Sequence, residues 1–156
     1  MKKDFVATGL IFDSEKRILL VDHKRVGLWL PPGGHLEEEE TPEDALVREV
    51  KEETGFDIEV IGSCIKETTI GNVKPLIAPF HVQMEDIPKD SRRSFAHNHI
   101  DLIYLCKIIG GELLHNKEEH HGIQWFSLEE MKKTPRVSKD TIVLAEKALK
   151  QKQNKF

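Results

Sequence analysis

One stretch of the sequence contains the start, the interior and the end of a single helix. Thr41 is a favoured N-cap residue, Pro42 suits the first helical position, and Asp44 stands where the acid of a capping box would. Gly55 is a natural C-terminal stop. Apolar residues occupy one side at helical spacing: Ala45, Leu46 and Val50. The pattern therefore predicts a helix between Thr41 and Gly55.

The last turns of this predicted helix are acidic, which local stability disfavours. Glu49, Glu52 and Glu53 lie near the negative end of the helix dipole, where each carboxylate costs about 0.3–1 kcal/mol. Their spacing also puts them on one face, where like charges repel. Two interpretations fit this pattern. The face is either a solvated acidic surface or a site for a divalent cation such as Mg²⁺ or Mn²⁺, which take oxygen ligands.

The wider segment GHLEEEETPEDALVREVKEETGF, residues 34–56, resembles the Nudix box. That motif reads Gly, five residues, Glu, seven residues, Arg-Glu-apolar-x-Glu-Glu-x-Gly-apolar, and it matches here without a gap. The matching positions are Gly34, Glu40, Arg48, Glu49, Val50, Glu52, Glu53, Gly55 and Phe56. The chain is thus similar to the Nudix (MutT-like) hydrolases. The resemblance implies their α/β/α sandwich, an α/β (α+β) fold with a mixed central sheet.

The resemblance also implies roles for individual residues. Glu52 and Glu53 would be metal ligands, and Glu49 would be either a ligand or the base that activates water. Arg48 would orient these carboxylates through charge-assisted hydrogen bonds. The carbonyl of Gly33 would add a backbone ligand. In the same family pattern, Glu40 supports the geometry of the loop and helix.

A further carboxylate ligand is expected about six residues before a tryptophan in a late strand of the family. Trp125 makes Glu119 the candidate here, with Glu118 next to it. The alternative is that both glutamates belong to an ordinary charged turn. We therefore treat Glu119 as a predicted metal ligand that depends on the resemblance.

Two arginines could bind the phosphates of a substrate. Arg92 and Arg93 lie in residues 85–98, EDIPKDSRRSFAHN, which we interpret as the longest mobile loop. A guanidinium group matches the geometry of a phosphate. The alternative is that both arginines are solvated loop charges.

Histidines near two late strands form a second set of candidates. Strand alternation puts His97, His99 and Asp101 on one face, which is either a substrate- or metal-binding face or a surface histidine pair. We include His99 among the predicted substrate-binding residues. His120 and His121 are interpreted as exposed turn residues.

The resemblance implies metal-dependent hydrolysis of a diphosphate linkage in a nucleoside diphosphate derivative, for example a (d)NTP or a nucleotide conjugate. Water would attack phosphorus, with Mg²⁺ or Mn²⁺ as the cofactor. One alternative is a non-catalytic, nucleotide-binding regulatory module on the same fold. Another is an isoprenoid-diphosphate isomerase, which normally needs a reactive cysteine; neither Cys64 nor Cys106 stands in a plausible loop. Both cysteines are interpreted as free thiols in strands.

Length and charge restrict the remaining possibilities. A chain of 156 residues fits a single domain, residues 1–156. The net charge of −4 gives no general attraction to nucleic acid or to anionic lipid, so the expected partner is a small nucleotide-like molecule. No apolar run has the length of a membrane span, and no signal peptide is recognised, so a cytoplasmic location is expected. A homodimer is possible by analogy with the family.

The rest of the chain is interpreted mainly as strands. The first two, 5–13 and 17–23, form a hairpin, and 27–35 is a short strand that leads into a Pro-Pro-Gly-Gly loop. Four further strands are predicted at 56–67, 75–85, 99–110 and 122–128. A short helical turn follows the last strand, and a closing helix covers 138–151.

Overall fold

The computed structural model describes residues 2–89 and 93–153, and its strands form two sheets. The strands are β1 (Lys3–Ile11), β2 (Ile18–His23), β3 (Leu28–Leu30), β4 (Gly33–His35), β5 (Phe56–Ile61), β6 (His81–Ile87), β7 (His97–Gly111) and β8 (His120–Phe126). The larger sheet has the order β4-β1-β7-β5, with β6 also paired to β7, and the smaller has the order β3-β2-β8. β1 and β7 are parallel and the other pairs antiparallel, so the predicted mixed sheet is confirmed.

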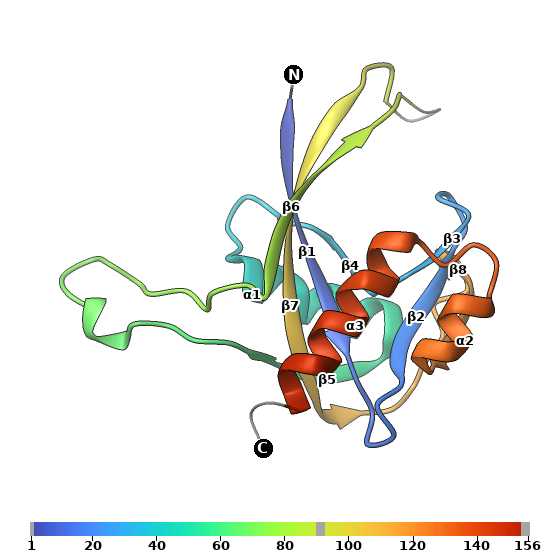
Figure 1. The fold of residues 1–156 in the computed structure, drawn as a ribbon. Coiled ribbons are helices and arrows are strands. Elements are labelled where there is room, and N and C mark those ends of the chain that lie inside the picture. Colours follow the sequence, from blue (N-terminus) through green and yellow to red (C-terminus); the bar gives the residue numbers. More distant parts are fainter. Residues whose placement is uncertain (1, 90–92, 154–156) are drawn as a thin grey trace.

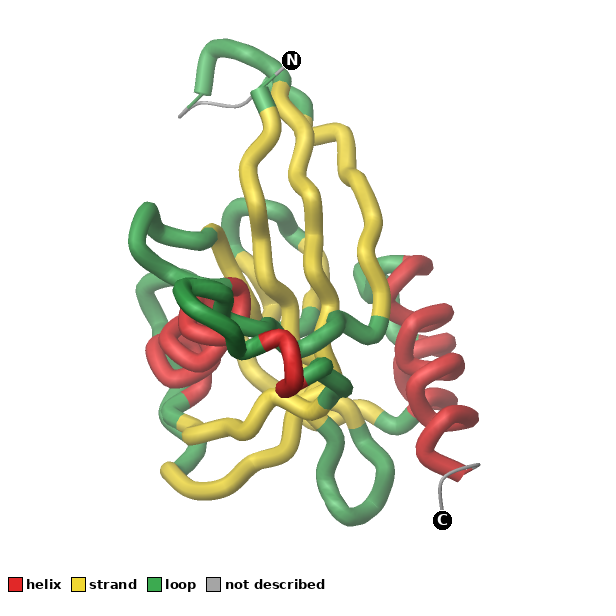
Figure 2. Tube along the Cα trace, turned by 90° about the vertical axis from the view of Figure 1, so that its left-hand side faces the viewer, coloured by secondary structure: helices red, strands yellow, loops and turns green. Residues whose placement is uncertain are grey.

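Helices cover both faces of the larger sheet. α1 (Pro42–Thr54) and α3 (Lys139–Gln153) lie on opposite sides of it, as the two views in Figure 1 and Figure 2 show. The short α2 (Leu128–Lys133) lies beside α3, and a 3-10 helix (Lys66–Thr68) lies in the loop after β5. This is the α/β/α arrangement expected from the sequence. None of the helices in the described part of the chain has the length and apolar content that crossing a membrane requires.

β1 supplies side chains to two apolar cores because successive residues of a strand point to opposite faces. On the α1 side, Ala7 packs in a buried cluster with Leu46 and Val50. On the α3 side, Leu10 packs in a second buried cluster with Leu144. The sheet is therefore held from both faces, and the position of α1 relative to β1 is set by close apolar packing.

The ends of α1 are closed as the sequence predicts. The Thr41 hydroxyl accepts a hydrogen bond from the Asp44 N–H, and the Asp44 carboxylate accepts one from the Thr41 N–H, both at 3.2 Å. Gly55 ends the helix with φ at 78°, and its N–H donates to the carbonyl of Lys51. A Cβ atom at Gly55 would lie 2.2 Å from the carbonyl oxygen of Glu112, so only glycine fits there.

Two predicted strands, 56–67 and 75–85, are wrong in their extent. β5 stops at Ile61 and β6 starts only at His81, so that most of residues 62–80 is loop. Pro75 and Pro79 lack the N–H that strand pairing needs. Instead, the Ala78 N–H donates to the carbonyl of Ser63 at 2.8 Å and draws the two ends of this loop together.

The predicted loop at 85–98 is shorter than expected. β6 continues to Ile87 and β7 begins at His97, because the two strands pair as far as these two residues. Residues 62–80 form a longer connection within the described part of the chain. Residues 90–92 of the predicted loop, including Arg92, lie outside the described residues.

The predicted Pro-Pro-Gly-Gly loop contains a short strand. Residues 27–35 form two strands, β3 and β4, and β4 pairs antiparallel with β1. In that pairing Gly33 lies opposite Thr8, and Gly34 lies opposite Ala7. No periodic pattern predicts β4, because three residues are too few and two of them have no side chain.

An ion pair between a buried carboxylate and a half-exposed arginine connects β2 to the segment before α3. The Arg136 guanidinium donates to both carboxylate oxygens of Asp22, at 2.8 and 2.9 Å. Asp22 is buried, and its hydrogen bonds with Arg136 lower the pKa of its carboxyl group despite that burial. Since the ionised form is favoured in the folded protein, the pair stabilises the fold when Asp22 is charged.

We expect Arg136→Met to lower the thermal midpoint by roughly 2–4 °C at pH 7, because the Asp22 carboxylate loses its partner. The pKa of Asp22 is lowered on folding, so this stabilisation is present above the ordinary value of about 3.9 and is lost as pH falls through the folded-state pKa. The difference between variant and wild type should therefore shrink in acid. Circular dichroism melts between pH 7 and pH 3 measure it.

The matched control is Lys132→Met, which removes a surface ion pair of 3.9 Å with Glu129. Exposed pairs of this kind contribute little, so its midpoint should stay near wild type at every pH. An Arg136→Met loss that is independent of pH would contradict the role given to the charge on Asp22.

Candidate active site

The three glutamates of α1 occupy different environments. Glu53 is buried, with 3% exposure, whereas the Glu52 side chain is 56% exposed and that of Glu49 is 17% exposed. Glu53 accepts a hydrogen bond of 2.9 Å from the N–H of Gly33 on β4. Burial raises the pKa of Glu53, and His120 and the Gly33 N–H act in the opposite direction. The acidic face is therefore only partly a solvated surface.

His120 is the residue at this site that the sequence interpretation missed. It is 1% exposed, and its Nε2 atom lies 3.2 Å from Oε1 of Glu53. The prediction of an exposed turn is wrong for His120, whereas His121 is exposed. β8 begins at His120, two residues before the predicted strand, and pairs there with His23 of β2. Alternation extended back from the apolar part of β8 was the one available signal, and it is interrupted by a register shift that places one extra residue in β8 between Ile123 and His120.

Glu119 lies next to this buried pair. Three potential ligand atoms lie within 4.8 Å of one another, one each from Glu53, Glu119 and His120. These side chains come from α1 and from the β8 region, which are far apart in the sequence. The proximity of Glu119 to Glu53 makes a shared cation geometrically feasible, and its role as a ligand stays a prediction.

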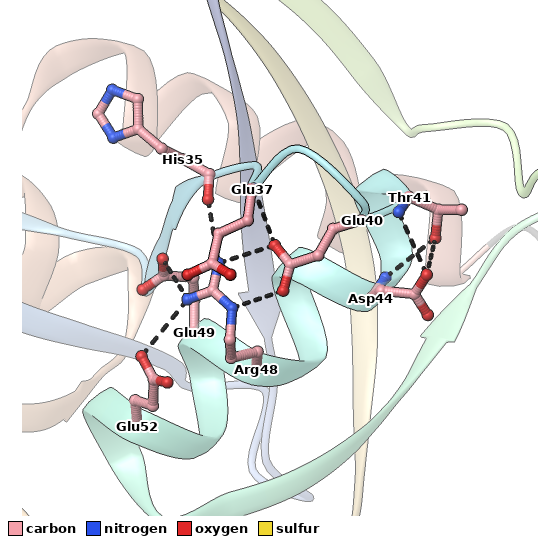
Figure 3. Close-up of polar contacts among 8 residues, drawn as sticks. All are labelled: His35, Glu37, Glu40, Thr41, Asp44, Arg48, Glu49 and Glu52. Atoms are coloured by element: carbon pink, nitrogen blue, oxygen red, sulfur yellow. Dashed lines mark hydrogen bonds and ion pairs between the residues drawn. The ribbon is translucent and has the colours of Figure 1, made fainter.

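Arg48 connects the remaining carboxylates, as Figure 3 shows. Its strongest contacts are two hydrogen bonds to Glu40, of 2.6 and 2.9 Å, and these lower the pKa of Glu40 to about 2. Arg48 also donates to Glu49 at 2.8 Å, to Glu52 at 3.4 Å and to the carbonyl of His35 at 3.1 Å. It therefore joins the loop before α1 to the last turns of the helix and offsets part of their repulsion.

The two glycines of β4 allow α1 to lie against the edge of the sheet. A Cβ atom at Gly34 would lie 2.4 Å from Oε1 of Glu49, in the space that its carboxylate occupies. A Cβ atom at Gly33 would lie 2.3 Å from the carbonyl oxygen of Ala7. Side chains at either position would separate β4 from the glutamates or from β1.

The donors present fit a divalent cation. Glu53 is a buried carboxylate whose pKa is raised by burial, and burial likewise raises the pKa of Glu49 against the effect of Arg48. A cation would compensate such desolvated charge. Carboxylates with one imidazole suit Mn²⁺, and Mg²⁺ accepts the carboxylate part of this set. Of the other predicted ligands, Glu49 is bonded to Arg48, Glu52 is mostly exposed, and Gly33 offers its N–H to Glu53.

A cavity of about 810 Å³ lies beside these residues and is large enough for a nucleotide-sized ligand. Gly33, Gly34 and Glu53 form part of its wall, and residues of β7 and α3 form another part, among them His99, Asp101, Asp140 and Thr141. Asp101 is buried, and burial raises its pKa to about 7 although a hydrogen bond with Thr8 opposes the shift. The cavity is therefore flanked by acids at two places.

Only one of the predicted substrate-binding residues among those described lines this cavity. His99 lines the cavity. Arg93 instead forms an ion pair with Asp4 on β1, and it does not line that cavity. Arg93 is therefore not simply a solvated loop charge, and its role in substrate binding stays a prediction. Arg92 lies outside the described residues.

The NUDIX domain family model matches residues 2–146, and the chain belongs to this family. The resemblance seen in residues 34–56 thus extends over nearly all of the sequence.

Among its relatives, a probable DHNTP pyrophosphohydrolase of Lactococcus lactis subsp. cremoris is 30% identical over 103 residues, covering 65% of this chain and 52% of the relative. An ADP-ribose pyrophosphatase of Methanocaldococcus jannaschii is 32% identical over 111 residues, covering 69% of this chain and 53% of the relative. An 8-oxo-dGTP diphosphatase of Proteus vulgaris is 41% identical over 61 residues, covering 36% of this chain and 54% of the relative. The chain spans about half the length of these curated relatives.

A solved structure has the same fold over its whole length. The Nudix-family hydrolase from Clostridium perfringens superposes with a TM-score of 0.75 and 29% identity, covering 97% of this chain and 99% of that one. The similarity includes both sheets and the helices that cover them, so the fold expected from the sequence is confirmed.

We expect Gly34→Ala to displace the Glu49 carboxylate, because the new methyl group occupies its space. The fold should persist, since the obstructing atoms belong to the end of a flexible side chain. Diphosphate hydrolysis should therefore fall by about 10-fold or more, whereas Mn²⁺ affinity, measured by calorimetry, should change little. Gly110→Ala is the control, since its Cβ would meet nothing closer than 3.4 Å. Wild-type hydrolysis by a folded Gly34→Ala protein would contradict this description.

Proposed function

We propose that this protein hydrolyses a diphosphate linkage in a nucleoside diphosphate derivative, with Mg²⁺ or Mn²⁺ as the cofactor. The observation that carries the proposal is the convergence of Glu53, Glu119 and His120 beside a cavity of about 810 Å³. Membership of the Nudix family and relatives named as diphosphatases and pyrophosphatases support it. We further propose that residues 1–156 act as one domain.

Different residues of the site would bind the cation, position a carboxylate and accept a proton. Glu53, Glu119 and His120 would hold the cation, with Glu52 at the exposed end of the same helical face. When bound, the cation neutralises phosphoryl charge and lowers the pKa of a coordinated water. Arg48 would hold Glu49 in position through its hydrogen bond of 2.8 Å. Glu49, as a partly buried carboxylate of raised pKa, would accept the proton from the attacking water.

The substrate is proposed at the level of its class. The relatives are named for 8-oxo-dGTP, for DHNTP and for ADP-ribose, each of which carries linked phosphates on a nucleoside or a similar group. A small molecule of this kind fits the volume of the cavity. Arg93 takes no part in this proposal because its guanidinium is paired with Asp4.

The isomerase alternative is not favoured. Cys64 does lie in the loop 62–80, contrary to the sequence interpretation, but it does not line the cavity described above. Cys106 is buried within β7. Both are free thiols, as predicted. A non-catalytic binding module differs from the proposal only in turnover, which experiment decides.

We expect Glu49→Gln to lower kcat by about 10²–10⁴-fold, because the amide cannot accept the proton, while Mn²⁺ affinity changes little. Glu53→Gln should instead weaken Mn²⁺ binding together with turnover. Calorimetric Mn²⁺ titration and phosphate release from a panel of (d)NTPs, ADP-ribose and nucleotide sugars measure both effects. The control Glu39→Gln changes an exposed glutamate of the same acidic loop and should behave as wild type.

Two outcomes would reject the proposal. Wild-type turnover by folded Glu53→Gln at saturating Mg²⁺ would remove this residue from the metal site. Binding of nucleotides without hydrolysis of any panel member would favour the regulatory module.

A further inference from the structure

Three imidazole groups and one carboxylate meet where β4, β1 and β7 lie side by side. Asp4 is on β1, His35 ends β4, and His97 and His99 begin β7. Asp4 lies directly opposite His99 in the parallel pairing of β1 with β7. His35 lies opposite Val6, which is on the same face of β1 as Asp4 because side chains alternate. The strand order thus gathers these four side chains on one face of the sheet.

The nitrogen atoms of this group have the spacing of metal ligands. Nε2 of His99 lies 3.1 Å from Nε2 of His35 and 3.2 Å from Nε2 of His97. Oδ2 of Asp4 lies 4.0 and 3.9 Å from the Nε2 atoms of His35 and His97. With Zn–N bonds of about 2.0–2.1 Å, a tetrahedral site places its nitrogen ligands roughly 3.3–3.4 Å apart. The imidazole nitrogens are therefore nearly in ligand positions.

Hydrogen bonding alone explains this convergence poorly. A neutral imidazole has one proton and one lone pair in the ring plane, divided between its two nitrogens. Nε2 of His99 therefore cannot form a linear hydrogen bond to both neighbouring rings. Neutral imidazole is the form that binds metals.

We propose that His35, His97, His99 and Asp4 form a second metal site, which binds Zn²⁺ or a similar imidazole-preferring divalent cation. It shares no residue with the cluster of Glu53, and its donors differ: imidazoles suit Zn²⁺, whereas carboxylates suit Mg²⁺ and Mn²⁺. His35 and His99 also line the cavity, so this cation would lie at the cavity wall. The inference does not depend on the proposed hydrolysis.

Two basic residues neighbour the carboxylate of this site. Arg93 pairs with Oδ2 of Asp4, and Lys2 lies 3.2 Å from Oδ1. The hydrogen bond with Arg93, the largest effect, lowers the pKa of Asp4 to about 2, so the carboxylate is ionised. Arg93 therefore competes with the cation for Asp4, while the three imidazoles remain available. We expect Arg93→Gln to increase zinc affinity, and a decrease would exclude Asp4 as a ligand.

The test is calorimetric titration of chelator-treated full-length protein with Zn²⁺, together with the visible spectrum of its Co²⁺ form. The wild type should bind zinc at micromolar concentration or below. His99→Asn and His35→Asn should each weaken this binding by at least about tenfold and reduce the cobalt bands. The matched control is His81→Asn, an exposed histidine on β6 outside both clusters, which should bind as wild type.

A second set of titrations distinguishes the two proposed metal sites. Glu53→Gln should keep the zinc binding that the histidine variants lose, and it should lose Mn²⁺ binding instead. Zinc binding abolished by Glu53→Gln and unchanged in His99→Asn would overturn the proposal, as would the absence of zinc binding by the wild type.

Folding is checked by thermal melts. Zinc should raise the midpoint of the wild type and of His81→Asn but not that of His99→Asn. The His35 side chain is 43% exposed at a strand end, so its replacement should disturb the fold little. His35→Asn therefore tests zinc binding even if His99→Asn does not fold. An equal zinc-induced rise in folded His35→Asn and wild type would also overturn the proposal.

Discussion

The hydrogen bond from the Gly33 N–H to the Glu53 carboxylate is the contact on which the site depends. It joins the edge strand β4 to the last turn of α1 at 2.9 Å. The contact is possible because neither Gly33 nor Gly34 has a side chain, and a methyl group at either would overlap Ala7 or Glu49. Through it, a helix packed on one face of the larger sheet presents its carboxylate to a cavity lined by strands of both sheets.

The acidic helix end is stabilised by partners outside the helix. Arg48 bonds Glu40, Glu49 and Glu52, so part of the repulsion is cancelled by one guanidinium group. Glu53 is buried beside His120 and lacks an arginine of its own among the described contacts. A cation at this position would supply the missing charge, which gives the unfavourable placement a physical reason.

The cavity is bordered by two donor sets of different chemistry. Carboxylates dominate around Glu53, and imidazoles dominate around His99. Since oxygen and nitrogen donors select different divalent cations, the two positions are distinguishable by metal identity as well as by mutation. The imidazole set is brought together by the pairing of β1 with β4 and with β7, whereas in the carboxylate set His120 of β8 meets Glu53 of α1.

The sequence alone determined α1, with its capping box, its glycine stop and its acidic face, because these depend on residues within a few turns of one another. The spacing of the box also indicated the family and hence the mixed sheet. Only the tertiary structure decided that His120 is buried against Glu53, and that Asp4 and His35 join His97 and His99. Those residues are far apart along the chain, and strand register, which has no local sequence signal in short strands such as β4, sets which of them meet.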